Sequence, residues 1–534
     1  MRGQLSARAG LLRPGPAPLR IFWLLGFAVF FAWFSYRIGG DGTPDFRGYH
    51  FYNGFAAVSG GRPGDIAAAQ LQTYFFPVLD AAYYLTFRGL DAHPGLLRAL
   101  LGLPYAVASW AVFRVGERVL PPSWPVRTPL AAVLALFGVT GAAGFATIGT
   151  TMSEIVPGLP ALVAIPFWLA RRDAGQPGLG AVAAGALCGL SLGLKLTFAP
   201  FFAGVLVAIF LCELPRLRAA SWLAFLFLVT GVVVTLAVAG WWWAHNYATL
   251  GNPIFPAFND VFRSDLADHG RWSDDRFKPR DWLMALFYPA YWAFRPSHFA
   301  IELDMRDPRM LIGLVSAIMV LLAIGLRRPR RASDYAAAFV ATVVLVAYGL
   351  WEFQFSIYRY LAVPECFSGV LAAAALALWV PPRLPLTRAA AAFLVVLAVV
   401  AARWTKYPWW VRSSPSSHVV EVSVPAMEPD SMVILLDDYQ MSFVVPFLQP
   451  SVRVIGANTN LVRPGSEGLL SRQIASAIRS HSGPIWGLED HTDLPDMADA
   501  TLVYYGLKRT GHCEPIHTNV ERDRIIACLL ARDS

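Results

Sequence analysis

Four ionisable side chains stand where this mostly apolar chain passes between apolar and polar stretches. Asp45 and Glu154 each follow an apolar segment, while Lys195 and Arg359 lie at the edges of two others. A carboxylate in such a place can act as general base for an incoming hydroxyl or amine. Lysine and arginine can hold a phosphate, arginine through two parallel hydrogen bonds. Together these residues suit sugar transfer from a lipid-phosphate donor, in which the cations stabilise the leaving phosphate.

The composition indicates a membrane protein. Of the 534 residues, 56% are hydrophobic and only 15% are charged, whereas a soluble domain carries about 25% charged residues. The apolar residues come in blocks of about twenty, the length that spans a bilayer. The net charge of +8 does not indicate nucleic-acid binding, because the basic residues cluster between apolar segments, where they orient a chain in the membrane.

Eleven apolar segments predict an all-α polytopic membrane domain with about eleven spans. They cover residues 21–37, 96–114, 129–148, 155–170, 178–195, 197–212, 221–243, 310–326, 336–351, 357–379 and 388–404. The short basic loops place the N-terminus in the cytoplasm of a bacterial inner membrane. The basic residues used for this are Arg2, Arg8, Arg13, Arg20, Arg114, Arg118, Arg127, Arg171, Arg172, Arg216, Arg218, the run 327–331, Arg383 and Arg388.

A twelfth apolar segment, 74–88, is predicted not to cross. It contains Pro77 and Asp80, and a charge at the bilayer centre costs about 3 kcal/mol on insertion scales. The basic loops alternate correctly only if this segment stays on one side. We therefore expect an interfacial or re-entrant helix within a long first outer loop, 38–94.

The chain beyond Trp404 has a pattern typical of a folded α/β domain and not of membrane spans. "SMVILLDD", "VRVIGA" and "ATLVYYG" predict short strands, and "GLLSRQIASAIRSH" predicts an amphipathic helix. We therefore divide the chain into a membrane domain, 1–404, and a small periplasmic α/β domain, 405–534. Cys513 and Cys528 could pair there, because that compartment is oxidising.

The predicted membrane topology places the unusual polar residues on the outer side of the membrane. They are Asp41, Asp45, Arg47, Tyr49, His50, Glu154, Lys195, His245, Asn246, Tyr358 and Arg359. Some have ordinary structural alternatives. Lys195 could extend its ammonium to the interface, and Glu154 could cap the next helix. Asp45 could be an N-cap, and His245 follows three tryptophans, as in an interfacial aromatic belt.

Several short motifs resemble the GT-C superfamily of integral-membrane glycosyltransferases, which use polyprenyl-phosphate-linked sugars at the extracytoplasmic face. The resemblance lies in "GDGTPDFRGYHFYNGFA" after the first span, "TMSE" in the second outer loop, and "GLKLT", "GNPIFPAFN" and "YRYLAVPE" at membrane borders. It covers most of the membrane part. A C-terminal periplasmic domain is also common in bacterial members.

The resemblance implies a role for each main candidate. Asp45 would be the catalytic base, with Asp41 as the alternative, and Glu154 would be the assisting acid of the second loop. Lys195 and Arg359 would hold the donor phosphate. The second loop has one acid rather than an adjacent pair, so no cofactor and no obligatory metal are expected, although a divalent metal stays open. Further substrate-binding candidates are Arg47, Tyr49, His50, His245, Asn246 and Tyr358.

The sequence thus predicts an inverting hexosyl- or pentosyltransferase that acts on a glycan, lipid or protein acceptor. A transporter or flippase for a lipid-linked precursor is the main alternative. Transporters place charges at the bilayer midplane, often in repeated halves, whereas here the polar residues collect at one face and no repeat is visible. The sequence does not distinguish a surface-polysaccharide polymerase or ligase from the glycosyltransferase interpretation. A non-catalytic assembly protein is a further alternative, and it would not need the acidic residues.

Overall fold

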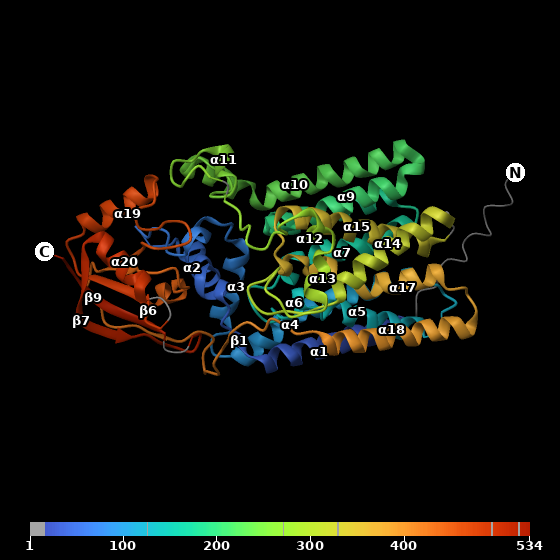
Figure 1. The fold of residues 1–534 in the computed structure, drawn as a ribbon, viewed down its shortest axis with the longest axis horizontal. Coiled ribbons are helices and arrows are strands. Elements are labelled where there is room, and N and C mark those ends of the chain that lie inside the picture. The colour runs from blue at the N-terminus through green and yellow to red at the C-terminus, as the bar shows by residue number, and fades with distance from the viewer. Residues whose placement is uncertain are drawn as a thin grey trace.

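The computed structural model describes residues 17–533 except 63, 125, 271, 328–330, 493–494 and 522–523. Arg2, Arg8, Arg13 and most of the basic run 327–331 lie outside the described residues. Figure 1 shows a long bundle of helices whose one end meets a region that contains the main sheet. The predicted fold class, a helical membrane domain followed by a small α/β region, is confirmed.

The bundle consists of helices that coincide with the predicted apolar segments. They are α1 (Ala17–Ile38), α4 (Pro94–Val119), α5 (Arg127–Val139), α7 (Ile155–Asp173), α8 (Pro177–Leu194), α9 (Ala199–Glu213), α10 (Leu217–Leu250), α14 (Arg309–Arg327), α15 (Ala332–Gln354), α17 (Ser368–Trp379) and α18 (Leu384–Trp404). Within the described residues, eight helical segments are long and apolar enough to cross a membrane. The number is nine if Tyr358–Glu365 and Ser368–Trp379, bent by 47°, form one span.

The predicted count of about eleven spans is therefore not confirmed. The helix α5 has only 13 residues, and residues 196–250 count as one segment. In that segment α9 and α10 are separate helices that pack against each other (Figure 1). The segment 74–88 contributes α3 (Val78–Gly89), which has 12 residues and is not among the eight.

The end of the bundle remote from the main sheet brings the predicted inner loops together. Ion pairs there join Arg20 and Arg114 to Glu117, Arg118 to Asp173, and Arg172 to Glu213. Glu117 is buried and its two partners are less than 20% exposed, so loss of one partner would leave a poorly solvated charge. The pairs also show that basic residues which the predicted topology assigns to one side of the membrane are neighbours in space.

Small residues allow the helices of the bundle to approach closely. A Cβ atom on Gly185 of α8 would clash with the carbonyl oxygen of Phe227 in α10, and one on Gly189 would clash with that of Gly231. Helix association in a membrane depends on such close packing, because apolar burial gives little gain there. The glycines in the α8 sequence therefore hold it against α10.

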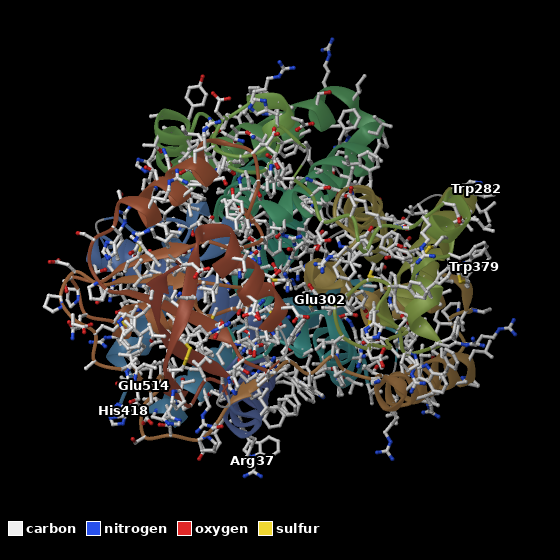
Figure 2. All side chains as sticks on the ribbon, turned by 60° about the vertical axis from the view of Figure 1, so that its left-hand side comes forward. Arg37, Trp282, Glu302, Trp379, His418 and Glu514 are labelled. Carbon is white, nitrogen blue, oxygen red and sulfur yellow. A yellow bond between two sulfur atoms is a disulfide. The ribbon has the colours of Figure 1, made fainter. Side chains whose placement is uncertain are left out.

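Aromatic side chains project from one side of the bundle. Between α10 and α14 the chain forms α12 (Trp282–Leu286) and α13 (Tyr288–Ala293). Trp282 is 77% exposed and Trp379 is also exposed, and both lie at the same side of the molecule (Figure 2). Tryptophan prefers the membrane–water interface, so this side is expected to face lipid.

The α/β region is built on a five-stranded sheet. Its strands are β4 (Met432–Leu435), β5 (Arg453–Gly456), β6 (Ile485–Asp490), β7 (Leu507–Pro515) and β9 (Ile525–Arg532), in the order β5-β4-β6-β9-β7. Strand β4 is parallel to β5 and to β6. Strand β9 is antiparallel to both of its neighbours, β6 and β7. Two helices, α19 (Leu469–Ser480) and α20 (Pro495–Tyr505), belong to this region.

One predicted strand of this region is wrong. Residues 500–506, "ATLVYYG", lie almost wholly in α20. The β-branched and aromatic side chains favour a strand locally, but the buried residues Ala498, Thr501, Leu502 and Tyr505 follow helical spacing, while Val503 is exposed. Packing against the sheet therefore overrides the local preference.

Cys513 and Cys528 form a disulfide between adjacent residues of β7 and β9. The bridge closes a loop of 15 residues, which in the chain-entropy description stabilises the folded state by about 3 kcal/mol. Replacing both cysteines with serine should lower the unfolding temperature of the α/β region, measured by thermal unfolding in detergent. Cys212→Ser, at a half-buried free thiol, is the control; equal melting of the two variants would contradict the prediction.

The first outer loop is part of the α/β region in space. Strand β1 (Gly40–Asp41) pairs with β2 (Arg412–Ser413). Ile66 forms a parallel bridge with Ile455 on the edge strand β5. Its amide donates to the Val454 carbonyl at 3.0 Å, and its carbonyl accepts from Gly456 at 2.9 Å. Helices α2 (Phe51–Ser59) and α3 share one apolar core with β4, β5 and β6.

Candidate active site

Asp45 immediately precedes η1 (Phe46–His50), a short π-helical turn. Such turns are frequent at functional sites. The Asp45 carboxylate makes no capping hydrogen bond to this helix. Instead, Tyr49 Oη donates to Asp45 Oδ2 at 3.1 Å, and Arg359 Nη1 lies 3.6 Å from the same oxygen. The capping alternative is therefore not realised, and the carboxylate faces a cation from a distant part of the chain.

The surroundings of Asp45 keep it ionised. Its side chain is 16% exposed. Burial raises the pKa of the carboxyl, but the charges of Arg359, His50 and Lys195 outweigh this, so the pKa lies below its usual value. Burial and the Asp45 charge together raise the pKa of Tyr49 well above its usual range. Tyr49 is therefore a stable hydroxyl donor to a negatively charged carboxylate.

A second ion pair joins Glu154 and Lys195. Glu154 precedes α7 and Lys195 follows α8, and Lys195 Nζ lies 2.5 Å from Glu154 Oε1. Glu154 is almost fully buried and makes no capping bond, and its Oε2 has no hydrogen-bond partner. The ammonium of Lys195 thus points to a buried acid, so neither the capping nor the interfacial alternative describes this pair.

One aromatic ring links the two pairs. Tyr360 belongs to η5 (Tyr358–Leu361). Its ring centroid lies 5.6 Å from Lys195 Nζ and 5.4 Å from the Arg359 guanidinium carbon, within the range of cation–π attraction. Two cations and two carboxylates from four separate segments therefore meet around Tyr360. Sequence reasoning missed this residue, although it directly follows Arg359.

Glu302 is a further residue that the sequence did not single out. It is exposed, lies in the loop between α13 and α14, and is labelled near the middle of Figure 2. Its charge attracts Arg359. No spacing or motif around it indicates this position, because the loop folds back over η5 only in the tertiary structure.

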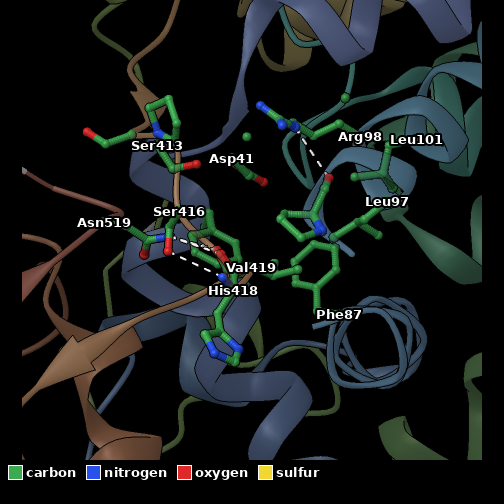
Figure 3. A pocket seen from close by; sticks show the side chains of 16 residues that line it. Asp41, Phe87, Leu97, Arg98, Leu101, Ser413, Ser416, His418, Val419 and Asn519 are labelled. Carbon is green, nitrogen blue, oxygen red and sulfur yellow. Dashed lines mark hydrogen bonds between the residues drawn. The ribbon is translucent and has the colours of Figure 1, made fainter. Parts of the chain in front are cut away.

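Asp41, the alternative base, holds two loops together. Its Oδ1 accepts hydrogen bonds from the amide and hydroxyl of Thr43 at 3.0 and 2.7 Å, and its Oδ2 accepts from those of Thr151 at 2.6 and 2.8 Å. It also lines a narrow pocket together with Leu97, Ser413 and others (Figure 3). A carboxylate has about four acceptor positions. With four filled, Asp41 has none left for a substrate proton.

Arg47 faces the α/β region and not the two ion pairs. Its Nη1 donates to Tyr439 Oη at 2.5 Å, and it forms an ion pair with Glu521. His50, on the same turn, places Nδ1 2.6 Å from Asp80 Oδ1, and its Nε2 is buried without a partner. We therefore assign Arg47 to the contact with the α/β region, whereas His50 remains next to Asp45.

His245 and Asn246 lie on α10, apart from the paired residues. His245 is exposed and packs on Trp242 with ring centroids 5.4 Å apart, as in an aromatic belt. Asn246 Nδ2 donates to the carbonyls of Tyr74 and Pro253 at 3.1 and 3.4 Å. The Asn246 bonds join the end of α10 to neighbouring loops, whereas the His245 contact lies within α10. A substrate contact of either residue stays a prediction.

Tyr358 belongs to a buried polar network beside the site. Its hydroxyl donates to Glu365, and its amide donates to the Ala300 carbonyl at 2.6 Å. The network includes Asp307 and Arg309, whose Oδ2 and Nη1 are 2.7 Å apart. Tyr358 is fully buried, and the contacts of its side chain are structural, while its predicted contact with substrate stays a prediction. It holds the segment that carries Arg359.

The same network fixes the segment that leads into the second outer loop. Asp307 Oδ2 accepts from the amide of Ala142 at 2.8 Å, and Glu365 Oε2 accepts from that of Ala143 at 3.0 Å. These amides begin the short helix α6 (Ala142–Phe145), where carboxylates are favourable. Among the described residues, no group of three His, Cys, Asp or Glu side chains is placed to hold a metal ion.

No protein-family model matches the sequence, and no curated protein matches it. A comparison with solved structures finds similarity to a chain described as the crystal structure of ArnT from Cupriavidus metallidurans bound to undecaprenyl phosphate. The identity is 14% and the TM-score 0.41, over 96% of this chain and 98% of that chain.

Proposed function

We propose that the protein is a membrane glycosyltransferase. It would move a hexosyl or pentosyl group from a polyprenyl-phosphate-linked donor to a glycan, lipid or protein acceptor, with Asp45 as general base. The observation that supports this is the meeting of Asp45–Arg359 and Glu154–Lys195 around Tyr360. It agrees with the GT-C resemblance of the sequence motifs.

In this proposal the two ion pairs are the resting form of the site. Each cation is held by a carboxylate of the same site, at 3.6 Å for Arg359 and 2.5 Å for Lys195. A donor phosphate would compete for both cations, since charge-assisted bonds from Arg and Lys to phosphate are strong. When Arg359 turns to the phosphate, Asp45 loses a neighbour that lowers its pKa and becomes a stronger base.

The proposed reaction assigns a role to each of these residues. Asp45 takes the proton of the acceptor hydroxyl or amine while the acceptor atom forms a bond to the anomeric carbon. The bond from that carbon to the phosphate oxygen breaks, and its electron pair leaves with the polyprenyl phosphate. Arg359 and Lys195 stabilise the additional negative charge on this leaving group. Attack opposite to the leaving group inverts the anomeric configuration.

Arg359→Ala should raise the KM for the lipid-linked donor by at least about tenfold, because a hydrogen bond to a charged group contributes about 1.5–3 kcal/mol. The measurement is initial-rate transfer by the purified protein over a range of donor concentrations. Arg306→Ala removes a half-buried guanidinium that packs on Trp404 and is the matched control. An unchanged donor KM in Arg359→Ala would exclude a phosphate contact for this residue.

The proposal places the α/β region and the site at the extracytoplasmic face of a bacterial inner membrane. Ser123 and Ser451 are both exposed; Ser123 lies between α4 and α5, and Ser451 precedes β5. Cysteine at position 451 should react with an impermeant maleimide on spheroplasts, whereas cysteine at position 123 should react only after lysis. Labelling of position 123 from outside would refute the predicted membrane topology.

A further inference from the structure

The carboxyl ends of the parallel strands β5 and β4 meet the first outer loop. In open α/β sheets this edge is the usual place for a ligand. Here Gln70 Nε2 donates to the Asp438 carbonyl at 3.0 Å, and the Leu71 amide donates to Asn460 Oδ1 at 2.9 Å. Ser442 Oγ donates to the Ala68 carbonyl at 2.5 Å. Residues 68–71 of the chain itself therefore occupy this edge.

The turn that follows Asp45 is bound to the same region. Phe46 and Arg47 are almost fully buried. The Arg47 guanidinium contacts the Tyr439 hydroxyl, lies 5.0 Å from the centre of the Tyr439 ring, and pairs with Glu521. Tyr439 follows β4 and Glu521 precedes β9. Two separate segments of the α/β region thus hold one side chain of η1.

Apolar and backbone contacts add to this hold. A Cβ atom on Gly48 would lie 3.1 Å from Gln440 Cγ and 3.5 Å from Gln440 Cβ. Just after η1, Phe51 stacks on Phe447 with ring centroids 6.1 Å apart and planes at 12°. Asp45 and Tyr49 lie on the same segment but interact with each other and with Arg359. The segment therefore has one set of contacts with the α/β region and another with the bundle.

We infer that Arg47, Tyr439 and Glu521 are positioning residues, through which the α/β region sets the place of Asp45 opposite Arg359 and Lys195. This inference rests on the proposed function, since the place of Asp45 affects transfer only if Asp45 is the base. A displacement of about 1 Å between reacting groups can lower a rate about 100-fold. The α/β region is then a working part of the transferase site.

The first test compares Arg47→Ala with Arg62→Ala. Arg62, in the same loop, also binds the α/β region, through the carbonyls of Leu448 and Gln449, but it does not contact η1 in any of these bonds. We expect Arg47→Ala to lower kcat about 100-fold with an unchanged donor KM. Arg47→Lys should restore part of kcat. Arg62→Ala should keep the kcat of the wild type at equal amounts of folded protein.

Tyr439→Phe separates position from charge, because it removes the hydroxyl that accepts from Arg47 without removing a charged group. It should lower kcat less than Arg47→Ala and leave the unfolding temperature nearly unchanged. Equal losses of kcat in Arg47→Ala and Arg62→Ala, or a kcat of Arg47→Ala within about twofold of the wild type, would overturn the inference. Retained transfer in Asp45→Asn would instead overturn the choice of base.

A cross-link gives a readout that does not depend on the reaction. The distance between position 48 and Gln440 matches the separation of about 3.5–4.5 Å between Cβ atoms in a disulfide. Gly48→Cys with Gln440→Cys should therefore cross-link on mild oxidation, seen by a gel shift after proteolysis, and the cross-linked protein should transfer sugar at the rate of the reduced form. The two single-cysteine variants, treated alike, are controls. Failure to cross-link, or loss of transfer only on cross-linking, would show that the contact opens in the working protein.

Discussion

Replacing Asp45 with asparagine is expected to abolish sugar transfer, lowering kcat by about 100-fold to 10,000-fold, the contribution of a general base. Asparagine preserves the shape of the side chain and can still accept from Tyr49, so the amount of protein in membranes should not change. Transfer from a polyprenyl-phosphate-linked sugar by the purified variant is the measurement. Because the pKa of Asp45 in the ligand-free protein lies below its usual value, kcat/KM, which reports the free enzyme, should fall on acidification only below the usual titration range of an aspartate.

Asp41→Asn is the matched control for this prediction. It replaces the other acid of the same loop, whose oxygens accept from Thr43 and Thr151. This variant should fold less well but retain transfer per folded molecule. If instead Asp45→Asn is active and Asp41→Asn inactive, the base is Asp41. If both are active, the proposed chemistry is wrong.

Replacing Asp307 with alanine is expected to destabilise the folded protein by about 3–5 kcal/mol. Asp307 and Arg309 are fully buried, and removal of one partner leaves the other as an unpaired charge in a medium that solvates it poorly. The amides of Ala142 and Arg309 would also lose their acceptor. The expected result is a large loss of folded yield and a lower unfolding temperature in detergent.

Two further variants test the cause of this loss. Asp304→Ala removes a half-exposed acid that pairs with Lys406 and His298, and such pairs contribute only about 0–1 kcal/mol. The double variant Asp307→Leu/Arg309→Met should be more stable than Asp307→Ala, since neither charge remains. If the double variant is less stable than the single one, the loss has a cause other than the unpaired arginine.

Much of the membrane domain follows from the sequence because apolar length and basic loops act locally. The pairing of the site residues does not. The sequence predicts that Asp45, Glu154, Lys195 and Arg359 reach one face, but it cannot tell which carboxylate meets which cation. That depends on where α7, α8 and η5 end relative to one another. The ring of Tyr360, which joins the two pairs, carries no sequence signal beyond its position.

The least predictable feature is that Arg47 and Asp45 have different contact partners. Both lie in the same short stretch, and either could contact a substrate. Only the tertiary structure shows that Arg47 meets Tyr439 and Glu521. A boundary at residue 404 places the first outer loop with the membrane domain, whereas its apolar side chains share a core with the sheet.

The contact between Arg47 and Glu521 also has a consequence for biosynthesis. A chain is made from its N-terminus, so Asp45 is synthesised early and Glu521 late. Until the strands after residue 431 have folded, η1 lacks its support, and Phe46 and Phe51 lack the core that buries them. Under the proposed function, a nascent chain would carry Asp45 without a finished site, and transfer would begin only when synthesis is nearly complete.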